Sequence, residues 1–336
     1  MPLTLEDIAQ ISGYSRSTVS RVVNGDSAVS DKTRKQVMEV LHRFDFQPNM
    51  AARGLALGKT RVLGLVIPMG VRAIFADPFF PLVIQGVSTN CNTRDYSVML
   101  WLAEPEYERR TITKILYNGL IDGVIVASML LDDPIVESLV LSKLPFVLIG
   151  RHPVHEHISY VDVDNKIGSR QAILHLLRLG RRRIATITGP QNMIAGMDRY
   201  QGYLDVMHER GILPNPELVM EGDFSDAGGY AAMQRLLQYK PDAVFAASDI
   251  MALGAIRAAH DAGLRIPQDI AIVGFDDIPM ASQSIPLLTT IRQPIVRSGF
   301  IAADILIDLV ENSPETPQHI ILPTELVIRE SCGSNL

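Results

Sequence analysis

Residues 4–24 read TLEDIAQISGYSRSTVSRVVN and carry the signals of two short helices joined by a tight turn. Thr4–Asp7 is a capping box, which predicts a helix that starts at about Thr4 and ends near Gly13. Ser15 can cap a second helix over Arg16–Val23. Two helices around a glycine-containing turn are typical of a helix-turn-helix, so the start of the chain predicts this motif.

The second of these helices is expected to have two unlike faces. Val19, Val22 and Val23 recur at three and four residues, so they can face a core. The opposite face is polar and basic and consists of Arg16, Ser17, Ser20, Arg21 and Asn24. Such side chains bond base edges and phosphates in the major groove of DNA. The solvated face of a plain three-helix bundle would have the same pattern, so both interpretations remain open.

A third helix is expected to begin after the cap sequence Ser30–Thr33. Its Val37, Val40, Leu41 and Phe44 lie at i, i+3, i+4 and i+7, which places them on one helical face. We expect these four residues to complete a small three-helix core.

The net charge of the 336-residue chain is −6, which by itself would argue against a nucleic-acid partner. The charge is unevenly distributed, however. Residues 1–60 hold 8 Lys and Arg against 6 Asp and Glu, or +2, and the remainder holds 23 against 31, or −8. The charge of each part is therefore more informative than the charge of the whole.

Composition also bears on cellular location. Two cysteines, Cys91 and Cys332, are too few for a disulfide framework. The N-terminus carries Glu6 and Asp7 where a signal peptide needs positive charge. No apolar run approaches the roughly 20 residues that cross a bilayer. We expect a cytoplasmic, nucleoid-associated protein with no membrane partner.

The segments Thr4–Ala9, Gly13–Asn24, Val29–Arg34 and Phe46–Asn49, in this order, resemble the LacI/GalR family of bacterial repressors. In that family the second helix enters the major groove, and the resemblance implies that Arg16 and Ser17 dominate the choice of base. The DNA contacts implied for this domain, residues 1–48, are Thr4, Leu5, Arg16, Ser17, Ser20, Arg21, Asn24, Ser30 and Thr33.

Residues 49–60 match the family's hinge, which becomes helical on operator DNA and enters the minor groove. The contacts implied here are Asn49, Ala52 and Leu55, and Leu55 matches the leucine that wedges between central base pairs. Gly54 lowers helix stability by about 1 kcal/mol, so we expect a hinge that is disordered without DNA. A plain flexible linker is the alternative interpretation.

From Arg61 onward, apolar runs rich in Val and Ile alternate with segments of helical length. The expected strands are Val62–Ile67, Tyr96–Trp101, Gly123–Ala127, Phe146–Ile149, Ile184–Thr188, Ala243–Ala247 and Ile270–Gly274. The expected helices include Pro81–Arg94, Gly168–Leu179, Arg199–Arg210 and Met251–Ala262. This order predicts a doubly wound α/β architecture with buried parallel strands.

Ligands of open parallel sheets sit beyond the carboxyl ends of the strands. The charged residues at these ends are Arg151, Asp249, Asp276 and Asp277. Carboxylates and an arginine can hold the hydroxyls of a sugar, while aromatic rings cover its apolar face. Asp249 is equally well explained as the N-cap of the helix that follows.

Further segments look like the effector-domain landmarks of the same family: Asp198–Tyr203, Gly222–Ser225, Ser248–Gly254, Val273–Asp277 and Leu288–Gln293. The resemblance implies a periplasmic-binding-protein-like domain, 61–336, with two α/β lobes of parallel sheet joined by three crossovers. The N-lobe would span about 61–160 plus 292–322, and the C-lobe about 161–291 plus 323–336. The full fold is thus expected to be an all-α headpiece followed by this two-lobed domain.

The ligand residues implied by the resemblance are Phe79, Phe80, Arg151, Arg199, Phe224, Ser248, Asp249, Asp276 and Gln293. Arg199 and Asp276 are expected to bond the ligand, and the loop containing Asp77–Phe80 is expected to supply an aromatic wall. Core packing at the start of a helix would explain Phe79 and Phe80 nearly as well. We expect no cofactor and no metal, and we interpret the histidines at 152, 155 and 157 as an exposed loop.

Taken together, these features favour a ligand-responsive transcriptional repressor. It would bind a pseudo-palindromic double-stranded operator as a homodimer, or as a larger assembly, and respond to a small molecule such as a sugar or sugar derivative. A transport-type binding protein would need a signal peptide. An enzyme is the remaining alternative, although the chain has no Gly-x-Gly-x-x-Gly after a strand, no phosphate-binding loop and no Gly-x-Ser-x-Gly elbow.

Overall fold

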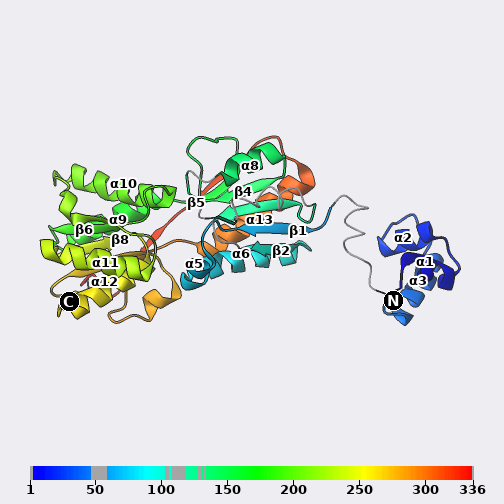
Figure 1. The fold of residues 1–336 in the computed structure, drawn as a ribbon, viewed down its shortest axis with the longest axis horizontal. Coiled ribbons are helices and arrows are strands. Elements are labelled where there is room, and N and C mark those ends of the chain that lie inside the picture. Colours follow the sequence, from blue (N-terminus) through cyan, green and yellow to red (C-terminus); the bar gives the residue numbers. More distant parts are fainter. Residues whose placement is uncertain are drawn as a thin grey trace. The chain divides into compact units, whose positions relative to one another are not determined.

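A computed structural model describes residues 3–46, 59–102, 106–107, 119–127, 130–131 and 134–334. The chain forms two compact units, Met1–Thr60 and Arg61–Leu336, whose elements are labelled in Figure 1. None of the helices in these described ranges has the length and apolar character that crossing a bilayer requires.

The first unit contains three helices, α1 (Leu5–Ser12), α2 (Arg16–Val23) and α3 (Asp31–Arg43). The predicted capping box is confirmed, because the Asp7 amide donates to Thr4 Oγ1 (3.3 Å) and the Thr4 amide donates to Asp7 Oδ2 (2.7 Å). Ser15 and Ser30 cap α2 and α3 as expected. Gly13, with φ of +72°, ends α1 in the left-handed conformation that glycine adopts readily.

A small apolar cluster holds these three helices together, and it consists of Ile8, Ala9, Val19, Val22, Val37 and Leu41. Val40 packs against its edge, as its spacing predicted. The expectation for Phe44 was wrong, since this side chain is 40% exposed. The helix ends at Arg43, so Phe44 leaves the periodic face, and Phe46 packs on the cluster in its place.

The second unit contains two six-stranded sheets. The first has the order β11-β5-β4-β3-β1-β2 and is parallel throughout. Its strands are β1 (Val62–Val66), β2 (Ser97–Trp101), β3 (Gly123–Ala127), β4 (Phe146–Ile149), β5 (Tyr160–Val163) and β11 (His319–Leu322). We call this sheet and the helices packed on it the first lobe.

The second sheet has the order β12-β10-β9-β8-β6-β7 and is parallel except for the antiparallel edge pair β10–β12. Its strands are β6 (Ile184–Thr188), β7 (Val219–Glu221), β8 (Ala243–Ala246), β9 (Ala271–Asp276), β10 (Thr289–Arg292) and β12 (Glu325–Val327). This sheet and its helices form the second lobe.

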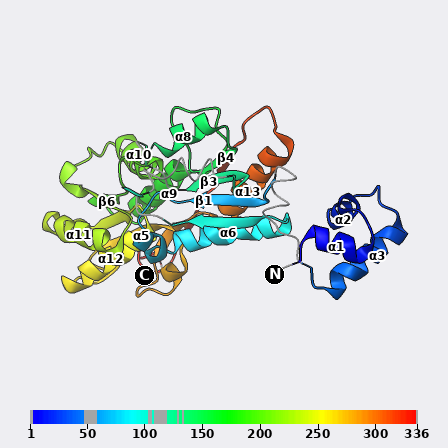
Figure 2. The ribbon, with the colours of Figure 1, turned by 45° about the vertical axis from the view of Figure 1, so that its right-hand side comes forward.

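Helices cover both faces of each sheet (Figure 2). In the first lobe, α5 (Val71–Ala76), α6 (Phe79–Thr93) and α13 (Ile295–Asn312) pack on one face, and α8 (Ile135–Ser142) packs on the other. In the second lobe, α9 (Asn165–Arg178) and α10 (Ile194–Glu209) cover one face, and α11 (Asp226–Leu236) and α12 (Asp249–Asp261) cover the other. Three short 3-10 helices, Pro216–Leu218, Leu237–Tyr239 and Pro279–Ser282, complete the second lobe.

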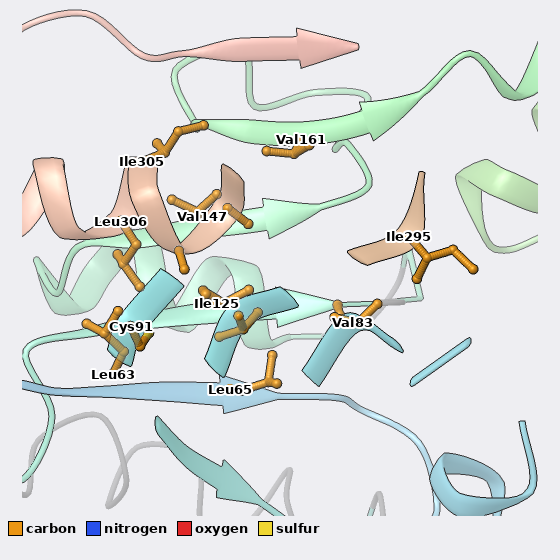
Figure 3. Packing of buried hydrophobic residues seen from close by; sticks show 14 of the residues in the cluster. Leu63, Leu65, Val83, Cys91, Ile125, Val147, Val161, Ile295, Ile305 and Leu306 are labelled. Atoms are coloured by element: carbon orange, nitrogen blue, oxygen red, sulfur yellow. The ribbon is translucent and has the colours of Figure 1, made fainter. Parts of the chain in front are cut away.

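The apolar strands fill both faces because successive side chains alternate between them. Leu63 and Leu65 point toward α6 and α13, whereas Val66 lies in the cluster beneath α8. Figure 3 shows the first of these clusters, with Val83 and Leu306 descending from the two helices onto the strands. The central strands of each sheet are therefore buried on both faces, which leaves their ends as the sites where polar groups can gather.

The chain passes between the two sheets three times, at residue 164, at 293–294 and at 323–324. The first crossing falls a few residues later than the sequence suggested, because β5 pairs with β4 and β11 in the first sheet. Arg292 likewise belongs to β10 of the second sheet. These three crossings set the ends of several strands from both lobes opposite one another.

Helices α6 and α13 approach each other unusually closely at two glycines. A Cβ added at Gly86 would lie 2.0 Å from the carbonyl oxygen of Val296, and one at Gly299 would lie 2.5 Å from that of Val83. Backbone atoms cannot rotate aside as a side chain does, so the two helices can pack this closely only with glycine at both positions.

We expect Gly86→Ala to lower the free energy of unfolding by about 3 kcal/mol, because overpacking against backbone forces the helices apart. Urea denaturation of the full chain measures this loss. Gly64→Ala is the matched control, since the nearest atom to its new Cβ would be the end of the Ile121 side chain at 3.1 Å. Equal losses for the two variants would contradict the assigned role of the close helix contact.

Candidate functional site

A cavity of about 170 Å³ lies between the strand ends of the two lobes. A smaller cavity of about 80 Å³ adjoins it. The two share the lining residues Phe79, Met193, Ala195, Arg199 and Gln293. Of the nine ligand residues expected from the sequence, the structure brings seven to the larger cavity: Phe79, Phe80, Arg199, Phe224, Ser248, Asp276 and Gln293. Arg151 lines the smaller one.

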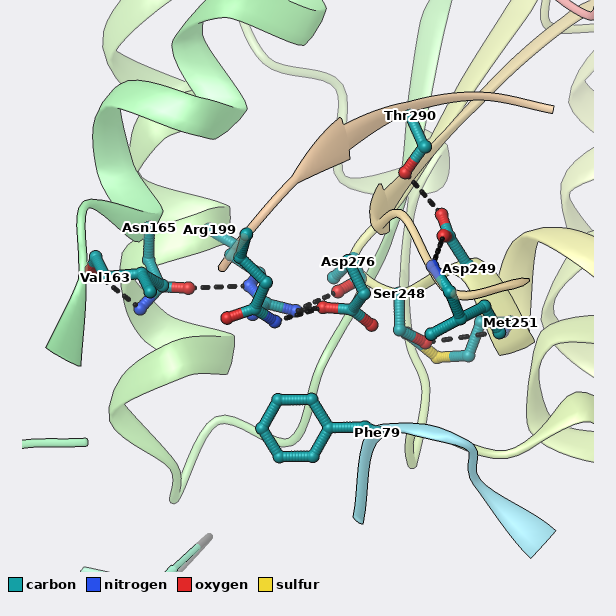
Figure 4. A network of polar contacts seen from close by, with 12 residues as sticks. Phe79, Val163, Asn165, Arg199, Ser248, Asp249, Met251, Asp276 and Thr290 are labelled. Atoms are coloured by element: carbon teal, nitrogen blue, oxygen red, sulfur yellow. Dashed lines mark hydrogen bonds and ion pairs between the residues drawn. The ribbon is translucent and has the colours of Figure 1, made fainter. Parts of the chain in front are cut away.

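Arg199 extends from α10 and forms the centre of a buried polar network (Figure 4). Its Nε donates to Asn165 Oδ1 (2.8 Å), and its Nη1 donates to the Ala247 carbonyl (2.6 Å). Nη1 also lies 3.2 Å from Asp276 Oδ1. The guanidinium carbon is 3.7 Å from the ring centre of Phe275, so one face of the cation is covered by an aromatic ring. None of these bonds uses Nη2, which is left to donate elsewhere.

Asp276 is the last residue of β9 and adopts a strained backbone, with φ of +122°. Its Oδ1 also accepts a hydrogen bond from Gln293 Nε2 (2.5 Å). Burial raises the pKa of Asp276 to about 7, against the opposing effect of the Arg199 guanidinium. A second cavity residue, Phe224, also has positive φ, at +58°. Backbone strain of this kind gathers at binding sites, where the surrounding structure enforces it.

Aromatic rings from both lobes form the apolar wall of the larger cavity. Phe79 and Phe80 begin α6 with ring centres 5.4 Å apart at 86°, and Phe224 comes from the second lobe. Phe80 lines the cavity and is also 4% exposed within the core of the first lobe, so it packs at the start of a helix as the alternative interpretation expected. Phe79 lies at the edge of that core, and Figure 4 shows its ring beside the Arg199–Asp276 pair.

Ser248 and Asp249 occupy neighbouring positions at the start of α12 but face different surroundings. Ser248 lines the cavity and is the N-cap of α12, because its Oγ accepts from the Met251 amide (3.3 Å). Asp249 is not a lining residue of either cavity, and its carboxylate accepts from the Ile278 amide (2.9 Å) and from the Thr290 hydroxyl. Burial raises its pKa above the ordinary range. Asp249 therefore lines neither cavity, and the N-cap of α12 is Ser248 and not, as predicted, Asp249.

Arg151 follows β4 and joins the two lobes. Its Nη1 lies 2.7 Å from Asp162 Oδ2 in β5 and 2.7 Å from Asp198 Oδ2 in α10 of the second lobe. Asp162 Oδ1 in turn accepts from Asn165 Nδ2 (3.2 Å), and Asn165 Oδ1 accepts from Arg199 Nε. A continuous polar chain therefore runs from this interlobe ion pair to the cavity.

Asp77, Asn165 and Asp223 are polar neighbours of the cavities that the sequence analysis did not assign. Asp77 Oδ1 accepts from the Phe79 amide (2.9 Å), and burial raises its pKa. The sequence did offer a signal for Asp77. It lies two positions before Phe79 in the loop that was expected to line the cavity, so it could be expected to lie near the cavity as well. Asn165 follows the first crossing and carried no comparable signal.

The three histidines of the 152–157 loop lie together, with ring centres 4.6 Å apart for His152 and His155 and 5.3 Å apart for His155 and His157. His155 Nε2 is 2.7 Å from Glu137 Oε1. No group of three or more His, Cys, Asp or Glu side chains in the described ranges is arranged to hold a metal ion.

In the first unit, α2 presents the polar face expected from its sequence. Arg16 and Ser17 are exposed, as are Arg21 and Asn24, while Ser20 is half-buried. Arg16 Nε lies 3.4 Å from Glu6 Oε2, and both side chains are about two-thirds exposed (68% and 67%). A pair this exposed contributes little to stability, so Arg16 can leave Glu6 for a contact with DNA at a small cost in free energy.

The remaining expected DNA contacts have structural roles of their own. Thr4 and Ser30 cap helices, and Ser30 Oγ also bonds Thr33 Oγ1 (2.9 Å). Their position at helix N-termini suits phosphate, since free backbone amides point outward there. Leu5 packs against the core of the unit. The other three expected contacts, Asn49, Ala52 and Leu55, lie outside the described residues.

Comparison with known proteins shows the family of the chain. A profile of bacterial regulatory proteins of the lacI family matches residues 4–49, and a periplasmic binding protein-like domain matches residues 173–332. The HTH-type transcriptional regulator CelR of Thermobifida fusca is 39% identical over 333 residues, or 98% of each chain. The chain belongs to the LacI family.

Two solved structures are similar to this LacI-family chain over almost its full length. A CelR–cellobiose complex matches with a TM-score of 0.79 at 37% identity, covering 98% of this chain and 99% of that one. The lac repressor dimer bound to operator and the anti-inducer ONPF matches with a TM-score of 0.86 at 28% identity, covering 99% of both. The predicted architecture, a helical headpiece followed by a two-sheet α/β domain, is confirmed, and the LacI-family chain is a transcriptional regulator and not an enzyme.

Proposed function

We propose that this regulator represses transcription by binding a pseudo-palindromic operator as a homodimer and that a sugar or sugar derivative in the larger cavity controls it. The observation that carries this proposal is the buried Arg199–Asp276 pair, held at 3.2 Å beside an aromatic wall. The relatives support it, since CelR is described with cellobiose and lac repressor as a dimer on operator DNA. Its place of action would be the cytoplasm, on the nucleoid.

For DNA recognition, the proposed headpiece is residues 1–48. Arg16 and Ser17 would contact bases from α2, and the helix-capping residues Thr4 and Ser30 would fix the headpiece on phosphates. The proposed hinge, 49–60, would add Asn49, Ala52 and Leu55 in the minor groove between two half-sites. A dimer doubles the +2 charge of residues 1–60, and the −8 of the rest would limit non-specific binding.

For the effector, Arg199 and Asp276 would bond hydroxyls while Phe79 and Phe224 cover the apolar face of the ring. Gln293 and Ser248 would contribute further polar contacts. Ligand would act by changing how the lobes close, and the Arg151–Asp198 pair would take part because it joins them. Coupling of this kind is typically about 1–3 kcal/mol and is reciprocal between ligand and DNA.

The proposal is tested by selecting operators from a random DNA pool with the full chain and then adding candidate sugars to the complex. We expect a pseudo-palindromic consensus and a change in operator affinity with at least one sugar. An asymmetric consensus would contradict dimeric recognition.

A further inference from the structure

The charged lining of the larger cavity is mostly acidic. Four carboxylates, from Asp77, Asp223, Asp226 and Asp276, face one guanidinium, from Arg199, among its lining residues. Asp226 Oδ2 is paired with Arg257 Nη2 at 2.7 Å, and Asp223 is exposed to solvent at the rim. The deeper charged groups are therefore Asp77, Arg199 and Asp276, which together carry an excess of negative charge when ionised.

Arg199, the cation among these three residues, already has partners within the protein. Arg199 is 5% exposed, its Nη1 lies 3.2 Å from Asp276, and its Nε bonds Asn165. Its Nη2 can still donate to a ligand oxygen, but its charge is balanced by Asp276. Arg199 can therefore donate hydrogen bonds to a bound ligand through Nη2, but it offers the ligand no uncompensated positive charge.

Asp77 brings a second carboxylate to the same cavity from the first lobe. Its Oδ1 is fixed by the Phe79 amide at 2.9 Å, which places it at the start of α6 beside the aromatic wall. Its charge acts on the second lobe, because it raises the pKa of Asp276 and is itself stabilised by Arg199. The two acidic residues therefore act on the same space from opposite lobes.

Resting on the proposed function, we propose that Asp77 and Asp276 make the cavity selective for an uncharged polyhydroxylated ring over its phosphorylated form. Hydroxyl groups donate hydrogen bonds, and a carboxylate that accepts one forms a short, strong bond. A fully ionised phosphate has acceptors but no donor, so a phosphorylated position that faces Asp77 or Asp276 cannot donate to the carboxylate and is repelled by its like charge. The cavity therefore accepts sugars and excludes sugar phosphates.

The test uses matched pairs with the full chain: glucose and glucose 6-phosphate, ribose and ribose 5-phosphate, and cellobiose and its phosphate. Thermal unfolding and operator affinity are measured at about pH 8, above the pKa of about 7 of Asp276, so that Asp276 is ionised. We expect at least one uncharged member to raise the unfolding temperature and none of the phosphates to do so. A phosphate that shifts it as far as its uncharged partner, or a panel without any shift, overturns the proposal.

The variant Asp77→Asn tests whether Asp77 causes the preference for the uncharged sugar over its phosphate. It keeps the acceptor for the Phe79 amide but removes the charge, so we expect about tenfold weaker binding of the uncharged sugar and a smaller preference over the phosphate. Asp269→Asn is the control, because it removes the same charge from the loop pair with Arg265. Unchanged preference in Asp77→Asn overturns the role of Asp77.

These results also separate the inference from the proposed function. If a sugar phosphate alters operator affinity and its uncharged partner does not, the inference fails while ligand-controlled operator binding stands. If the full chain selects no operator from random DNA, the proposed function itself fails.

Discussion

Arg199→Ala is expected to weaken effector binding by at least about 100-fold and to abolish the response of the operator complex to ligand. The variant removes the Nη2 donors from the cavity and the partner of Asp276, and a lost charge-assisted bond to a ligand is worth about 3 kcal/mol. Operator affinity without ligand should remain, because Arg199 belongs to the second unit. Titrating the selected operator with and without sugar measures both quantities.

The same variant should become less stable as the pH rises. Arg199 opposes the raised pKa of Asp276, so its removal raises that pKa further above about 7. An acid with a raised pKa binds its proton in the folded state and releases it on unfolding, so the free energy of unfolding falls as pH rises toward the folded pKa. Arg170→Ala, which breaks an exposed pair with Glu209, is the control.

A ligand response that survives in Arg199→Ala would remove Arg199 from the site.

Arg16→Ala is expected to relax sequence preference at one base pair of each half-site by about 1–3 kcal/mol. Arg16 projects from the first turn of α2, and its exposed contact with Glu6 leaves it available to DNA. Affinities for the selected operator and for its single-base variants give the discrimination at each position.

Arg43→Ala provides the comparison for Arg16, since it removes the same charge from the exposed end of α3. Arg43→Ala should weaken DNA binding by the same factor for every operator sequence, because it removes only long-range attraction to the phosphates. If Arg16→Ala also weakened every sequence equally, Arg16 would be a phosphate contact and the choice of base would lie elsewhere on α2.

The parts of the fold with strong local signals were predictable from sequence. The three helices of the first unit follow from caps at Thr4, Ser15 and Ser30, and β3, β4 and β6 coincide with the expected runs. The strands that were not predicted, β5, β7, β10, β11 and β12, have three or four residues each, and several are half-exposed. Strands this short carry little local pattern, so pairing with their neighbours defines them, whether they lie at an edge, as β7, β11 and β12 do, or inside a sheet, as β5 and β10 do.

The candidate site was predictable where a residue ends a buried strand. Asp276 follows the apolar run of β9, and strand ends converge at one edge of a parallel sheet. Asp249 also follows a buried strand but does not line the cavity, because it lies one position into a helix and its carboxylate bonds Thr290 and Ile278. The bond between Asn165 and Arg199 spans 34 positions, and no local pattern could reveal it.

In the proposed mechanism, occupancy of the interlobe cavity controls operator binding. Fluorescence anisotropy titration of the selected operator, with and without a saturating uncharged sugar that binds the full chain, tests it directly. We expect the operator Kd of the parent chain to change by about tenfold or more, the sugar affinity on operator DNA to change by the same factor, and the operator Kd of Arg199→Ala not to change. An operator Kd that is the same with and without bound sugar would contradict it.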